Sequence, residues 1–115
     1  MENKVILIVA NESSPERETE YNEWYDEKHI PTMFRFQGMK RAGRYRLAGE
    51  NKGASKYLVI YEFDSRQSLE EFPRSAEYAA AIEDFDEKWK DGGFKNNWNA
   101  SYELIKSWEK IDSTS

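Results

Sequence analysis

The sequence of 115 residues contains no cysteine and only one histidine, His29. Without cysteine, disulfides, thiolate metal sites and cysteine nucleophiles are excluded, and one histidine excludes metal sites built from several histidines of one chain. Apolar runs are short as well, since none reaches the roughly 18 residues of a membrane helix. The first such run, residues 5–10, lacks the small-residue cleavage site of a secretory signal. These absences predict a cytoplasmic protein with no metal site and no membrane partner.

Basic residues are outnumbered, because 17 Lys and Arg face 22 Asp and Glu and give a net charge of −5. A surface that binds nucleic acid is normally basic, so the balance argues against a nucleic-acid partner. The length suits one domain. We expect it to span residues 1–115, with a frayed tail from about residue 110.

Aliphatic bulk is also scarce. Leu, Ile, Val and Phe together number 21 of 115 residues, just below the roughly 20% at which disorder becomes a concern in highly charged chains. Here the net charge is modest, and four Trp and seven Tyr supply the missing bulk. Each aromatic side chain can bury roughly 150–250 Å². We therefore expect a folded chain whose aromatic interior is either an ordinary core or the wall of a ligand pocket.

Hydrophobic patterning predicts four strands. The β-branched run at residues 5–10 does not alternate, which is typical of an interior strand covered on both faces. Residues 39–47 and 57–63 predict two strands joined by a long loop, and residues 98–108 predict the last strand.

Two helical regions separate these strands. In residues 16–36 the apolar stripe has helical spacing, but Pro31 disfavours helical geometry just before it and predicts a bend or break at residues 29–31. The second region begins at Asp64-Ser65, is interrupted by Pro73 and resumes with Ser75 as an N-cap.

The resulting order, β-α-β-β-α-β, predicts a ferredoxin-like α+β fold with helices on one face of an antiparallel four-stranded sheet. The first and third strands are apolar on both faces, so the second face of the sheet should be buried too. A symmetric homodimer that stacks sheet on sheet is the simplest way to bury it.

The segment with the densest chemistry surrounds His29. Asp26 lies three residues before it, a spacing that brings side chains together on a helix. A carboxylate that accepts one imidazole N–H makes the other nitrogen a better base. If Asp26 is ionised and within hydrogen-bond reach, it should raise the His29 pKa above about 6.5. A bend at Pro31 would aim the ring into a cavity. The alternative is that Asp26 caps the helix or is solvated, while His29 only hydrogen-bonds a carbonyl.

Two other sets of residues can be explained either by a structural role or by a functional one. A solvated strand face or an anionic-substrate site would explain Arg41, Arg44 and Arg46. Core or dimer packing, or a pocket wall, would explain Trp98, Tyr102 and Trp108.

One stretch resembles the EthD-like group of the dimeric α+β barrel superfamily, and the likeness extends over roughly residues 4–108. It rests on Tyr21-Asn-Glu-Trp24-Tyr25-Asp26-Glu-Lys-His29-Ile-Pro31, on Gly38 and on Arg44-Tyr45-Arg46-Leu47. The resemblance implies a homodimer whose two sheets form a barrel, with a cleft between helices and sheet in each protomer. It also implies that His29 is a cavity-facing acid/base.

From these residues we expect His29 and Asp26 to be catalytic and an aromatic set to bind the substrate: Trp24, Tyr25, Phe34, Tyr45 and Tyr61. A tyrosine, Tyr45, Tyr57 or Tyr61, would donate a proton. The expected function is proton transfer without metal or organic cofactor, of cyclase, isomerase or monooxygenase type, on an aromatic or polyketide-like carbonyl compound. The alternatives are a protein that binds a hydrophobic small molecule without turnover, and a structural or regulatory subunit with a vestigial cleft.

Overall fold

A computed structural model describes residues 4–111. Its four strands are β1 (Val5–Ser13), β2 (Met39–Arg46), β3 (Tyr57–Phe63) and β4 (Phe94–Glu103). They form one sheet in the order β2-β3-β1-β4, with every neighbouring pair antiparallel. This is the predicted ferredoxin-like topology, and β1 lies in the interior of the sheet as its non-alternating sequence predicted.

The first helical region runs without a break from Glu18 to Met33. It consists of α1 (Glu18–Trp24), a π-helical turn (Tyr25–His29) and α2 (Ile30–Met33). Of the bend or break predicted at residues 29–31, the break is therefore wrong. In a regular α-helix the proline ring would clash with the carbonyl four residues back. The wider π turn just before it changes the bonding pattern, and the Ile30 N–H donates to the Tyr25 carbonyl, five residues back.

The second helical region follows the prediction. Ser65 accepts the Ser68 N–H and caps α3 (Arg66–Glu71), and Ser75 accepts the Tyr78 N–H and caps α4 (Ala76–Lys88). A short 3₁₀ turn that contains Pro73 separates the two helices.

The last strand differs from its predicted range. β4 begins at Phe94, four residues earlier than expected, because Gly92 and Gly93 with φ of 91° and 96° turn the chain directly from α4 into the sheet. It ends at Glu103, and residues 104–111 form no regular element. Most of the predicted frayed tail, residues 112–115, lies outside the described residues.

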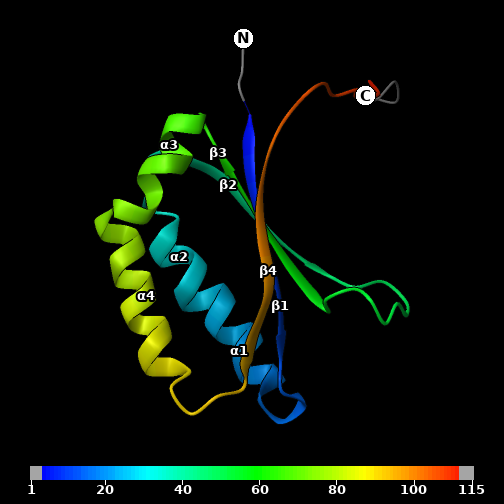
Figure 1. Ribbon diagram of the computed structural model, residues 1–115, viewed down its shortest axis with the longest axis vertical. Coiled ribbons are helices and arrows are strands. Elements are labelled where there is room, and N and C mark those ends of the chain that lie inside the picture. Colours follow the sequence, from blue (N-terminus) through cyan, green and yellow to red (C-terminus); the bar gives the residue numbers. More distant parts are fainter. Residues whose placement is uncertain (1–3, 112–115) are drawn as a thin grey trace.

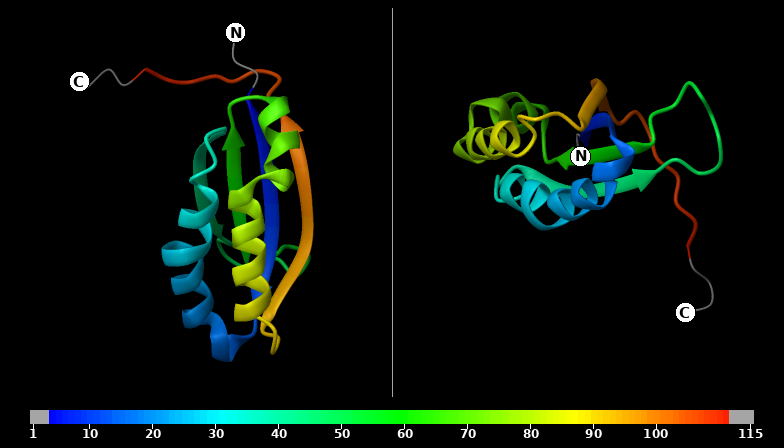
Figure 2. Two further views of the ribbon diagram at one scale, coloured as in Figure 1. Left: turned by 90° about the vertical axis from the view of Figure 1, so that its left-hand side faces the viewer. Right: turned by 90° about the horizontal axis from the view of Figure 1, so that it is seen from below.

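All the helices pack on one face of the sheet (Figures 1 and 2). Between the two layers lies an aromatic core that includes Tyr21, Trp24, Tyr25, Phe63 and Trp89, each no more than 7% exposed. No element of residues 4–111 covers the opposite face of the sheet, called the outer face below.

Candidate functional site

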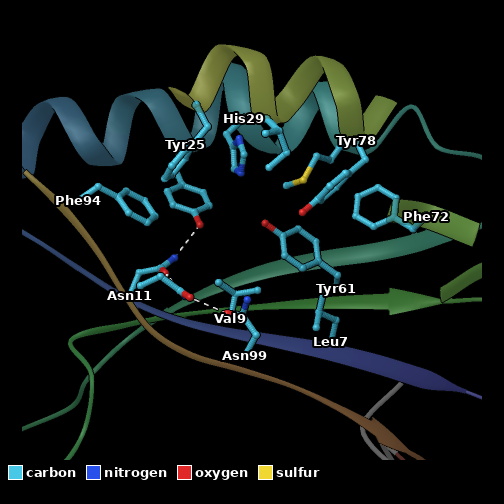
Figure 3. A pocket seen from close by; sticks show the side chains of 14 residues that line it. Leu7, Val9, Asn11, Tyr25, His29, Tyr61, Phe72, Tyr78, Phe94 and Asn99 are labelled. Carbon is cyan, nitrogen blue, oxygen red and sulfur yellow. Dashed lines mark hydrogen bonds between the residues drawn. The ribbon is translucent and has the colours of Figure 1, made fainter. Parts of the chain in front are cut away.

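A cavity of about 340 Å³ lies between the helices and the inner face of the sheet (Figure 3). Its wall is mainly aromatic and aliphatic. The polar lining residues are Asn11, Tyr25, His29, Tyr61, Tyr78, Asn96 and Asn99. Within the described chain, no Lys, Arg, Asp or Glu lines this cavity. A pocket of this kind favours a flat apolar ligand that carries a few polar groups.

His29 points into the cavity from the π turn (Figure 3). The residue is 7% exposed, and its ring stacks on Trp24 with centroids 4.3 Å apart and an angle of 21° between the planes. Within residues 4–111 the buried Nδ1 has no hydrogen-bond partner. The ring is thus held by aromatic packing instead of a polar contact at that nitrogen.

Burial lowers the pKa of His29 from 6.5 to about 4, and the Asp84 carboxylate opposes this only in part. The predicted rise of the pKa above 6.5 is therefore wrong. Burial disfavours the imidazolium more strongly than the nearby negative charge favours it. The imidazole of the free protein is neutral at pH 7 and able to accept a proton.

This low pKa should make the stability of the protein depend on pH. As pH falls below 6.5 the unfolded chain takes up a proton on His29 that the folded chain refuses until about pH 4. The free energy of unfolding should fall by about 2 kcal/mol between pH 7 and pH 5 from this residue alone. Urea unfolding at both pH values would measure it. His29→Phe, which keeps a flat ring, should remove that part of the difference, and an equal pH dependence in both proteins would contradict it.

Asp26 does not pair with His29. Its carboxylate accepts a hydrogen bond of 2.7 Å from the Arg44 guanidinium and is largely exposed. A spacing of three residues brings side chains together on an α-helix, but here it falls within the wider π turn, which alters that alignment. Asp26 was predicted to orient the His29 ring, but in the structure its carboxylate contacts Arg44 instead of the imidazole.

Arg44 also lies elsewhere than expected. Its side chain faces the helices at 16% exposure, donates to Asn22 at 2.6 Å and lies 5.0 Å from the centre of the Tyr25 ring. The solvated strand face predicted for Arg44 is therefore wrong at this position. Tyr45, which is 56% exposed, points from the same strand toward the outer face instead.

A chain of hydrogen-bonded polar side chains lines one end of the cavity. Asn11, fully buried, donates to the Tyr25 hydroxyl at 2.7 Å and accepts from Asn96 at 2.9 Å. Asn96 also donates to Asn99 at 2.9 Å (Figure 3). Asn11 satisfies the Tyr25 oxygen, which leaves the hydroxyl hydrogen of Tyr25 available as a donor.

Two more hydroxyls, those of Tyr61 from β3 and Tyr78 from α4, point into the cavity on the side of His29 (Figure 3). Tyr61 is 2% exposed. Burial, together with neighbouring Tyr25, raises its pKa well above 10. The hydroxyl is therefore a neutral donor at pH 7, suited to a carbonyl or enolate oxygen.

The structure brings three of the seven predicted site residues to the cavity: His29, Tyr25 and Tyr61. Trp24 lies behind His29 and touches it without lining the cavity. Phe34 and Tyr45 are 45% and 56% exposed and lie away from it, as does Asp26.

The remaining aromatic candidates are not part of the cavity either. Trp98 and Tyr102 stand on the outer face, 45% and 53% exposed, and Trp108 is 79% exposed beyond β4. The sequence analysis missed the other lining residues, among them the four polar ones Asn11, Tyr78, Asn96 and Asn99. Asn11 continues the alternation of Leu7 and Val9 along the inner face of β1, and this spacing could have revealed it.

Two structural features are absent from residues 4–111. These residues contain no group of three His, Asp or Glu side chains placed to hold a metal ion. No helix among them is long and apolar enough to cross a bilayer.

The fold and the cavity define an α+β protein of ferredoxin-like topology with a pocket between its two layers. The chain belongs to the family described as "Domain of unknown function (DUF4286)", whose model matches residues 4–96. A search of curated proteins found no relative.

Solved structures share this fold. An ethyl tert-butyl ether D (EthD) family protein from Bacillus halodurans is 19% identical, with a TM-score of 0.64 over 90% of this chain and 99% of that one. HapK from Hahella chejuensis is 10% identical, with a TM-score of 0.71 over 94% and 99%. SnoaB, a cofactor-independent oxygenase from Streptomyces nogalater, is 8% identical, with a TM-score of 0.67 over 94% and 99%. The EthD-like resemblance noted in the sequence is thus confirmed for the fold.

Proposed function

We propose that the protein is a cytoplasmic small-molecule enzyme in which His29 acts as a general base on an aromatic or polyketide-like carbonyl compound, without metal or organic cofactor. The observation that carries the proposal is a neutral, buried imidazole in an uncharged aromatic cavity, with the hydroxyls of Tyr61 and Tyr78 nearby. The aromatic wall suits the flat body of such a compound, and the hydroxyls suit its oxygens.

In the proposed reaction His29 takes a proton from a carbon next to the carbonyl group. The electron pair of the broken C–H bond moves to the carbonyl oxygen, where a hydrogen bond from Tyr61 or Tyr78 stabilises the enolate. An anion that forms beside the ring also favours imidazolium, so the proton affinity of His29 rises as the reaction proceeds. The carbanion can be protonated elsewhere, attack another carbonyl or react with dioxygen, which correspond to isomerase, cyclase and monooxygenase chemistry.

Among proteins of the same fold, the description of SnoaB as a cofactor-independent oxygenase supports a reaction without cofactor. The fold similarity supports the class of reaction only, since identity to SnoaB is 8%. The aromatic lining of the cavity is what supports the proposed class of substrate.

We also propose that the protein is a homodimer that packs outer face on outer face. Half-buried apolar side chains occupy the middle of that face: Ile6, Ile8, Leu58 and Ile60. The segment after β4 extends away from the helices, and it carries Ile105 and Ile111, each more than 90% exposed (Figure 2). A second copy would bury this apolar surface.

A screen of purified protein against polycyclic aromatic ketones and lactones tests the function. We expect at least one compound to bind, to raise the melting temperature and to be converted to a product of changed mass or absorbance. His29→Gln should keep the binding and lose the conversion. Binding without conversion, unchanged by His29→Gln, would instead establish a binding protein.

A further inference from the structure

Three side chains beside the cavity contact one another in series: Asp84, Trp24 and His29. The two rings among them, Trp24 and His29, are called the stack below. Trp24, the last residue of α1, donates its indole N–H to the Asp84 carboxylate of α4 at 2.8 Å. The face of the same indole lies against His29, with 4.3 Å between ring centroids. Asp84, Trp24 and His29 are thus connected in series, although only His29 lines the cavity.

The π turn makes this stack possible. Trp24 and His29 are five residues apart, and with 3.6 residues per turn such residues leave an α-helix in different directions. In the π turn at Tyr25–His29 the bonding pattern widens to five residues, as the Ile30 N–H bond to the Tyr25 carbonyl shows, and this brings residues at that spacing onto one side of the helix. The widened turn therefore places the imidazole of His29 against the face of the Trp24 indole.

The stack replaces the contact that usually orients a histidine base. Such a ring normally donates one N–H to a carboxylate or carbonyl, but the buried Nδ1 of His29 has no partner among residues 4–111. The Trp24 face and the Tyr25 edge, whose ring is 5.1 Å away at 87°, fix its plane instead.

We propose that Trp24 and Asp84 are positioning residues for His29: the indole fixes the plane of the imidazole, and the carboxylate that the indole N–H holds supplies the negative charge that stabilises imidazolium during proton transfer. The catalytic meaning of this arrangement rests on the proposed function of His29. Its physical content, an electrostatic link from Asp84 through Trp24 to His29, does not.

The surroundings of the ring leave Asp84 as the charge that acts on it. The titratable groups that face the cavity near His29 are Tyr25 on its own turn, Tyr61 on β3 and Tyr78 on α4. Burial raises the pKa of both Tyr25 and Tyr61, so these two hydroxyls remain neutral near pH 7. Within the described residues, Asp84 is the one charge that raises the pKa of His29.

Nuclear magnetic resonance tests the link without a substrate, because the chain has one imidazole. The His29 ring and the Trp24 indole N–H are followed from about pH 7 to pH 3 in the wild type, in Asp84→Asn and in Asp86→Asn. Asp86 is an exposed α4 residue and serves as the matched control. We expect Asp84→Asn to lower the His29 pKa by about 0.5 unit or more and Asp86→Asn to leave it unchanged. In the wild type the indole N–H should shift with the same midpoint as His29.

Several results would overturn the proposal. One is the same His29 pKa in Asp84→Asn as in the wild type. Another is a rise toward 6.5, which would mean that Asp84 only keeps the ring buried. If Asp84→Asn does not fold, Trp24→Phe keeps an aromatic face, removes the indole N–H and should also lower the pKa, and an unchanged value there would overturn the link. A failed substrate screen leaves these results intact, so the two proposals fail separately.

Discussion

Replacing His29 by glutamine is expected to lower the turnover of a substrate found by the screen at least about 100-fold and to change its dissociation constant only a few-fold. A positioned general base contributes roughly 10²–10⁴-fold to a rate. Glutamine keeps a polar group at the cavity wall but cannot take a proton at neutral pH. The measurement is kcat by steady-state kinetics together with Kd by calorimetry. Glu27→Gln is the control, because Glu27 lies on the same π turn with its side chain exposed.

The pH profile of the wild-type enzyme sharpens this prediction. Because burial lowers the His29 pKa to about 4, kcat/KM should lose activity on the acidic side only near that pH and stay flat from about pH 5 to pH 8. A loss of kcat/KM as the pH falls through about 7 would instead indicate a base with a raised pKa. Equal losses of kcat and of binding in His29→Gln would reduce His29 to a structural part of the wall.

Most of the fold was predictable from the sequence because its signals are local. The β-branched and aromatic residues of Tyr57–Phe63, the serine caps at Ser65 and Ser75, and the unbroken apolar run at residues 5–10 each define an element without knowledge of its neighbours. The first helical region differed from its prediction because a helix can accommodate Pro31 in two ways, by a break or by a widened turn. The choice between them depends on packing of the whole helix against the sheet.

The site was predictable only in part, and the π turn is the reason. Spacing on an α-helix paired Asp26 with His29, but the widened turn stacks His29 on Trp24 and leaves Asp26 to Arg44. Without the Asp26 contact, burial determines the shift, so the His29 pKa is lowered where the sequence predicted that it would be raised. Residues brought from distant elements, such as Tyr78 on α4, carry no sequence signal that connects them with His29.

A charge in the middle of the outer face should separate the proposed dimer into monomers. Ile60 of β3 stands opposite Ile8 of β1, with Gly43 and Ala100 on the strands to either side, so its side chain lies near the centre of this apolar surface. Ile60→Glu would bury two unpaired carboxylates in a symmetric interface, at a cost of several kcal/mol. We expect the dimer Kd to weaken more than about 100-fold.

Light scattering at micromolar concentration should give twice the 13.6 kDa chain mass for the wild type and the single mass for Ile60→Glu. Gln37→Glu, which adds the same charge at an exposed position before β2, should remain a dimer. A monomeric wild type would refute the dimer, and a dimeric Ile60→Glu would move the interface elsewhere. Neighbouring residues of a strand point to opposite faces, so Ile60 faces away from the cavity that Tyr61 lines. Ligand binding by the Ile60→Glu monomer will therefore reveal whether one protomer holds a complete site.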